Sequence, residues 1–194
     1  CLLYTLELTL SKANSLAGDE KAAKEFETKS LQRIEAIQKY CWNSEQQFFC
    51  DYNLATQSQQ QGITAAGLFP LFVKIATDEQ AKAVENITRK YLLKDGGMVT
   101  TTKHTGQQWD APNGWAPLQW IAFAGLNNYG HNELANEIAK RWLALNEKVF
   151  IETGKLMEKY NVEDLDKPAG GGEYPGQDGF GWTNGVYVAL KNNL

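Results

Sequence analysis

Apolar residues recur every three or four positions along almost the whole chain, and this feature most constrains the fold. Near the start, Leu3, Leu6 and Leu10 share one face of a helix, and a stripe from Ala23 to Cys41 keeps the same period. Alternation with a period of two, which would indicate strands, is almost absent. The sequence therefore predicts an all-α fold with about seven helices, at roughly 1–17, 23–41, 63–75, 77–91, 118–129, 134–149 and 182–190.

Glycine and proline divide the chain into tight turns and long connections. Gly18 and Gly130 stop helices abruptly, whereas residues 42–61, 94–117 and 151–181 carry no helical stripe. Long connections inside a compact domain are uncommon and are usually functional. The last two connections hold most of the glycine, a close pair of tryptophans and several isolated acids, so we expect the functional site there.

Composition excludes several kinds of partner. Hydrophobic residues make up 43% of the chain and charged residues 22%, as in globular proteins. The net charge of −4 and the lack of a basic run argue against binding to nucleic acid or to an anionic membrane surface. No apolar stretch approaches the roughly 18 residues of a membrane span. We therefore expect no nucleic-acid or membrane partner.

The cysteine and histidine residues do not form a metal-binding pattern. Cys1, Cys41 and Cys50 lack the close spacing of zinc ligands, and His104 and His131 stand far apart with no partner motif. We expect no metal and no cofactor. The thiols should be free and partly buried, although a disulfide between Cys41 and Cys50 stays open, and the histidines should lie at the surface.

Two tryptophans mark the first candidate site. Trp109 and Trp115 stand six residues apart, with Asp110 and Pro112 between them, which does not fit a simple helical stripe. Indole rings offer flat apolar faces on which a sugar can pack, and their N–H groups donate hydrogen bonds. The alternative is that both rings anchor the core under the following helix.

A glycine-rich loop at residues 169–185 is the second candidate site. Its glycines allow the backbone to approach a ligand closely, and Glu173 is bordered by Tyr174, Phe180 and Trp182. The loop lacks the lysine of a phosphate-binding P-loop. It could bind hydroxyl groups, or it could be a flexible linker before the last helix.

Chemistry on a glycosidic bond needs two carboxyl groups, an acid and a base or nucleophile. Spacing alone does not choose among the acids of the loops, and a solvated surface role is the alternative for each of them. The candidates are Asp110, Glu158, Glu163, Asp164, Asp166, Glu173 and Asp178.

Both loops resemble the trehalase family. Residues 108–117 read Q-W-D-A-P-N-G-W-A-P and match every fixed position of the family's Q-W-D-x-P-x-G-W-x-P signature. The stretch from Glu173 to Gly185 is similar to the family's C-terminal block, and the bacterial members are most similar. The resemblance implies part of an (α/α)6 toroid and hydrolysis of α,α-trehalose to two glucoses with inversion, which uses a general acid and a general base.

The resemblance also implies roles for individual residues. The family's general base is a Glu in a V-E-K-Y segment, which corresponds to Glu158 in M-E-K-Y, residues 157–160. A Glu after the glycines binds substrate hydroxyls and corresponds to Glu173. The residues expected to bind the sugar are Glu173, Trp109, Asp110, Trp115, Tyr174 and Phe180.

Some parts of the family pattern are missing. The P-G-G-R-F-x-E-x-Y-x-W-D signature and the segment that carries the general-acid Asp are absent, and the glycine run is shorter than in close relatives. We therefore expect residues 1–194 to be the C-terminal portion of a single catalytic domain without its N-terminal half, inactive alone. Its exposed helix faces should promote self-association.

Two other functions stay open, a non-catalytic sugar-binding or scaffold module and a different (α/α)6 glycosidase. The expected partner is a small sugar, trehalose or glucose for a trehalase. Relatives in this family occur in the periplasm and in the cytoplasm, so the sequence does not choose a compartment.

Overall fold

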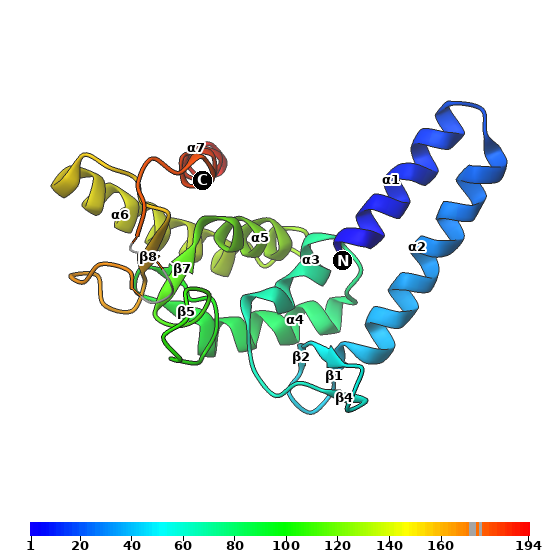
Figure 1. The fold of residues 1–194 in the computed structure, drawn as a ribbon, viewed down its shortest axis with the longest axis horizontal. Helices are drawn as coiled ribbons and strands as arrows, with labels where there is room; N and C mark the ends of the chain where they lie inside the picture. Colours follow the sequence, from blue (N-terminus) through cyan, green and yellow to red (C-terminus); the bar gives the residue numbers. More distant parts are fainter. Residues whose placement is uncertain (171–173, 175) are drawn as a thin grey trace.

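The computed structural model describes residues 1–170, 174 and 176–194 of the chain. Two long helices, α1 (Leu2–Leu16) and α2 (Glu20–Tyr40), form an antiparallel hairpin that projects from the rest of the chain (Figure 1). Arg33 on α2 donates two hydrogen bonds to the carboxylate of Glu7 on α1, at 2.7 and 2.5 Å. This paired contact ties the two helices together along the hairpin.

The remaining helices form the body of the fold. A 3₁₀ turn, η1 (Ala65–Leu68), leads into a single turn of α-helix, and a π-helical turn, η2 (Thr88–Leu92), follows the fourth helix. Within the described part of the chain there are seven α-helices, as the sequence predicts. Those of the body are α3 (Phe69–Phe72), α4 (Asp78–Ile87), α5 (Ala116–Asn127), α6 (Asn132–Thr153) and α7 (Gly181–Asn193).

The third predicted helix is much shorter than the expected 63–75. Thr64 instead forms a β-bridge with Thr101, and the amide of Ala65 donates to the carbonyl of Thr100 at 2.8 Å. At the other end, Lys74 has a left-handed backbone with φ of 61°, which ends the helix. Tertiary hydrogen bonds therefore replace helical ones at both ends of this segment.

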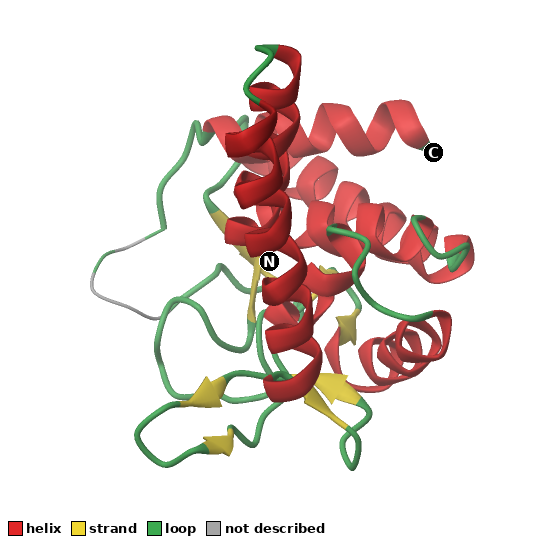
Figure 2. Cartoon of the chain, turned by 90° about the vertical axis from the view of Figure 1, so that its right-hand side faces the viewer, coloured by secondary structure: helices red, strands yellow, loops and turns green. Residues whose placement is uncertain are grey.

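Four small antiparallel sheets of two strands each lie between the helices and leave the predicted all-α class unchanged. Each strand has only two or three residues, too few for a period of two to show in the sequence. In Figure 2 the strands lie among the loops and form no layer of their own. The pairs are β1 (Trp42–Asn43) with β2 (Phe48–Phe49), β3 (Tyr52–Asn53) with β4 (Ser58–Gln59), β5 (Leu93–Lys94) with β6 (Gly97–Met98), and β7 (Asn113–Trp115) with β8 (Lys159–Asn161).

Short and long connections alternate between the helices. Gly18, Lys74 and Gly130 each supply a positive φ in a short turn, after α1, α3 and α5 respectively. The long connections follow α2, η2 and α6. Because successive helices run back and forth, the long connections gather at one end of the helix pairs, while α3, α5 and α7 pack side by side in a row. This is the arrangement of part of an (α/α) toroid.

The core lies where α5 and α6 meet the long loops. Trp115 and Trp142 are fully buried, and the amide of Gln119 bonds to both backbone groups of Met98, accepting from its N–H at 2.8 Å and donating to its carbonyl at 2.6 Å. Gly114 lies where β7 crosses this core, and there is no room beside it for a side chain. Residues 108–117 are therefore fixed by packing as well as stiffened by their prolines.

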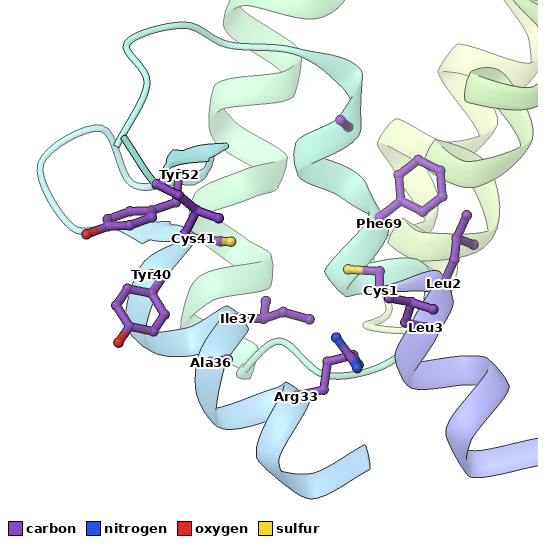
Figure 3. Close-up of a pocket in the computed structure, with 12 residues that line it drawn as sticks. Cys1, Leu2, Leu3, Arg33, Ala36, Ile37, Tyr40, Cys41, Tyr52 and Phe69 are labelled. Atoms are coloured by element: carbon purple, nitrogen blue, oxygen red, sulfur yellow. The ribbon is translucent and has the colours of Figure 1, made fainter. Parts of the chain in front are cut away.

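The α1–α2 hairpin leaves much apolar surface open. Leu2, Leu3, Leu6 and Leu16 on α1 are each more than half exposed. Leu2 and Leu3, with residues of α2, the β3–β4 hairpin and the start of α3, line an open cavity of about 650 Å³ (Figure 3). Among the helices of the described residues, none combines the length and the apolar character needed to cross a membrane.

Candidate functional site

Pairing of β7 with β8 brings together two long connections, residues 94–117 and 151–181, in which the sequence predicts the functional site. Asn113 lies opposite Asn161, Gly114 opposite Tyr160, and Trp115 opposite Lys159. The register therefore fixes the tryptophan-rich loop against the segment that carries Glu158. The sheet is the physical contact that joins these two parts of the chain.

Glu158 is almost completely buried, with 2% of its surface exposed. The hydroxyl of Tyr174 donates to its Oε1 at 2.8 Å, and Lys159 Nζ lies 3.5 Å from its Oε2. The backbone is also held, because the Glu158 amide donates to the Gln177 carbonyl at 2.8 Å and the Trp182 indole donates to the Glu158 carbonyl at 3.2 Å. A side chain that would ordinarily be solvated is thus fixed inside the protein from several sides.

Lys159, the next residue, has no exposed side-chain surface. Its ammonium donates to Gln108 Oε1 at 2.8 Å. The same nitrogen lies 5.4 Å from the ring centre of Trp115 and 5.1 Å from that of Tyr174, within the range of cation–π attraction. Sequence reasoning gave neither Lys159 nor Gln108 a role.

Three indole rings form a cluster beside this carboxylate. Trp109 stacks on Trp115 with ring centres 4.0 Å apart and planes 3° apart, and Trp182 meets both rings edge-on. Phe180 packs on Trp182 at 4.9 Å. Trp109 is 48% exposed whereas Trp115 is 1% exposed. Trp115 is therefore a core anchor in this arrangement, and the open indole face belongs to Trp109.

Asp110 uses its carboxylate to brace its own loop. Oδ2 accepts hydrogen bonds from the backbone and the hydroxyl of Thr105, at 2.5 and 2.6 Å, and from the amide of Gln107 at 3.3 Å. Asp110 and Trp109 also line a cavity of about 350 Å³ whose other walls are mostly hydroxyl and amide side chains, among them Thr101 and Gln60. The cavity thus offers hydrogen-bonding groups next to an open indole.

Most of the other candidate acids are engaged in ion pairs near the surface. Glu163 accepts from His104 at 2.7 Å and pairs with Lys94 at 3.2 Å. Burial alone would raise the pKa of the Glu163 carboxyl, but these two partners outweigh burial and hold it below its usual range. The remaining pairs are Asp164 with Lys167, Asp166 with Lys148, and Asp178 with Lys155. Glu173 lies outside the described residues.

Tyr160 completes the support of the segment around Glu158. Its hydroxyl accepts a hydrogen bond from the amide of Met157 at 2.8 Å, and its ring packs edge-on against Trp142 at 5.1 Å. Burial raises the pKa of Tyr160 to about 12, so the phenol stays neutral. These two contacts of Tyr160 therefore support the segment that carries Glu158.

The structure places no metal site among the residues that it describes, since no three His, Cys, Asp or Glu side chains there converge in a way that could hold an ion. All three cysteines are free. His104 is exposed as expected, whereas His131 is largely covered and pairs with Glu85 at 3.2 Å. The chemistry open to this site is that of a buried carboxylate beside a phenol, an ammonium and an indole platform.

These helix pairs, with long loops gathered at one end and a buried carboxylate among aromatic rings, define a segment of an (α/α)6-type fold with a candidate carbohydrate site. Comparison with known proteins narrows the class, because the trehalase family profile matches residues 1–194. The chain belongs to the trehalase family.

Individual relatives agree with this assignment. The chain is 46% identical over 189 residues to a periplasmic trehalase of Escherichia coli, which covers 97% of this chain and 34% of the relative. The neutral trehalase Nth1 of Saccharomyces cerevisiae has a TM-score of 0.84 at 29% identity, over 100% of this chain and 36% of that one. A mannosylglycerate hydrolase of Thermus thermophilus shares the fold, with a TM-score of 0.70 at 20% identity over 99% of this chain and 45% of that one. The chain spans about a third of the length of the curated relatives it matches.

Proposed function

We propose that this chain supplies the general base, Glu158, of an inverting trehalase. The observation that carries the proposal is the buried Glu158 carboxylate, fixed by Tyr174 beside the indole cluster in which the two family blocks meet. Burial and a fixed orientation are what a general base needs, because it must hold one water in line with the reacting carbon. The surface acids, which are held in ion pairs with lysines, offer no such arrangement.

In the proposed reaction Glu158 takes a proton from a water as that water attacks the anomeric carbon. The carbon–oxygen bond to the second glucose breaks, and a general acid gives its proton to the departing oxygen. That acid would come from the part of the enzyme beyond this chain, about 6.5–9.5 Å from Glu158, as inverting glycosidases require. The chain alone should therefore be inactive, and we propose that it is the C-terminal portion of one toroidal catalytic domain.

The sugar contacts follow from the exposed groups of the site. Trp109 presents an open indole face for the C–H surface of a glucose, while Tyr174 and Phe180 border the same region. Asp110 would act through its loop, and Glu173 would bind sugar hydroxyls as the family resemblance implies. Because the E. coli relatives are named periplasmic trehalases, the periplasm is our proposed compartment.

The test uses a full-length enzyme in which this chain replaces the matching segment of the E. coli periplasmic trehalase. Glu158→Gln should lower kcat about 10²- to 10⁴-fold, because the amide cannot accept the proton from water. The matched control is Glu152→Gln, an exposed acid on α6, which should keep native activity. Native activity in the Glu158→Gln enzyme would overturn the proposal.

A binding-only module would give a different result in the same experiment. The full-length chimera would then bind trehalose but release no glucose, with or without Glu158. A different glycosidase would show itself by preferring maltose or another disaccharide over trehalose.

A further inference from the structure

Lys159 is the most deeply buried charged side chain near the site, and burial of an ammonium is unfavourable unless it is well paired. Its nitrogen is satisfied by Gln108 Oε1 at 2.8 Å, by Glu158 Oε2 at 3.5 Å and by two aromatic rings. Because this ammonium is buried directly beside the proposed base, it does not serve solubility or surface charge.

The position of this ammonium is fixed by the fold. Lys159 lies in β8 opposite Trp115 of β7, so its backbone is held by the sheet that joins the two loops. The indole N–H of Trp115 donates to the backbone carbonyl of Gln108 at 3.0 Å. This hydrogen bond fixes Gln108, whose side chain accepts from the Lys159 ammonium. The Lys159 side chain therefore cannot turn toward solvent without losing its hydrogen bond to Gln108 and its ion pair with Glu158.

We propose that Lys159 is a positioning residue that holds the Glu158 carboxylate in the orientation needed for proton abstraction. The inference rests on the proposed role of Glu158 as the general base. A buried carboxylate loses the water that would otherwise donate to its oxygens, so each oxygen needs a fixed partner inside the protein. With Tyr174 on Oε1 and Lys159 on Oε2, each oxygen has one donor and keeps a lone pair for the attacking water.

The other ionisable neighbours do not replace this charge. Among the residues that the structure describes, Lys159 and Tyr174 are the ionisable side chains within hydrogen-bonding or ion-pairing distance of the Glu158 carboxylate. The hydrogen bond to Glu158 raises the pKa of Tyr174, so this phenol is neutral throughout the acidic range. The nearby Asp178 is paired with Lys155.

The experiment compares Lys159→Met, Lys159→Gln and Lys159→Arg in the full-length chimera described above. Both neutral variants should lower kcat by about tenfold or more while KM changes little, because the cation that fixes Oε2 of Glu158 is lost. Lys159→Arg keeps a cationic donor and should recover most of the native kcat. Lys191→Met, which removes an exposed lysine paired with Glu147, is the control that should behave as native.

A merely structural lysine would give another pattern. Melting temperatures would fall in the variants, but the folded enzyme would keep the native kcat, and this result would overturn the inference. Lys159→Gln can still hydrogen-bond to Gln108, so it reports on the charge if Lys159→Met does not fold. Failure of the proposed function is recognised separately, because Glu158→Gln would then remain active.

Discussion

Adding a single methyl group at Gly114 should disrupt the crossing that joins the two loops. A Cβ built on Gly114 would lie 2.5 Å from Val162 Cγ1, 3.0 Å from the Met98 carbonyl oxygen and 3.2 Å from Trp142 Cζ3. Ordinary carbon–carbon contacts are about 3.5–4.0 Å, so Val162 and the strand before it must move. Overpacking of this kind costs about 1–3 kcal/mol, which lowers the folded-to-unfolded ratio by roughly 5- to 150-fold.

Urea unfolding followed by tryptophan fluorescence measures this effect. With a slope of about 2 kcal/mol per molar urea, Gly114→Ala should lower the midpoint by about 0.5–1.5 M. Val162→Ala removes the closest methyl group, so the double variant should recover part of the loss relative to the two single variants. Gly185→Ala is the matched control, since it lies in α7 with nothing within 4 Å of the added Cβ, and it should stabilise the chain by about 0.5–1 kcal/mol. The reasoning is refuted if Gly114→Ala leaves the midpoint unchanged.

Three further predictions concern the aromatic cluster, an acidic surface pair and the exposed hairpin. Trp109→Ala should raise the KM of the full-length enzyme for trehalose by about fivefold to tenfold at nearly native stability, whereas Trp115→Ala should destabilise the fold by about 3–5 kcal/mol in urea; equal stability losses would contradict the assignment. Burial alone would raise the pKa of Glu163, but its pairing with His104 and Lys94 holds that pKa below the usual 4.5. The pairing therefore stabilises the fold above about pH 4.5, and this stabilisation is lost as the pH falls through the lowered pKa. The Glu163→Gln variant should therefore lose less stability than the native chain between about pH 5 and pH 3. If the free energies of unfolding of the two proteins fall in parallel with pH, the Glu163 pairing is not the source of the loss. In sedimentation the chain alone should form dimers or larger species through the apolar face of α1, and Leu6→Lys should shift it toward monomer; a native chain that is already monomeric would count against this.

The helices could be predicted from sequence because their signals are local. The stripe from Ala23 to Cys41 is α2, and α4 begins at a local capping box in which the side chains of Thr77 and Gln80 bond to one another's backbones. The segment after Ile63 could not be predicted in detail, since hydrogen bonds to the distant residue Thr100 replace its first helical bonds. Strands of two or three residues likewise depend on partners that a local pattern does not contain.

The candidate site was predicted in outline but not in its internal contacts. The two family blocks lie together, because Trp182 packs edge-on against Trp109 and Trp115. The contact of Tyr174 with Glu158 is one that the structure adds. The part played by Lys159 could not be foreseen, because a lysine next to a glutamate in sequence usually lies in solvent. Its burial follows from the pairing of β8 with β7, two segments that are far apart along the chain.

The most direct measurement is a crystal structure of the full-length enzyme, made inactive by Glu158→Gln and soaked with trehalose. We predict that the amide at this position lies within about 3 Å of a water placed for in-line attack on the anomeric carbon, with one glucose ring on the face of Trp109. A trehalose molecule bound elsewhere, with no water between the sugar and residue 158, would contradict the assignment of the general base.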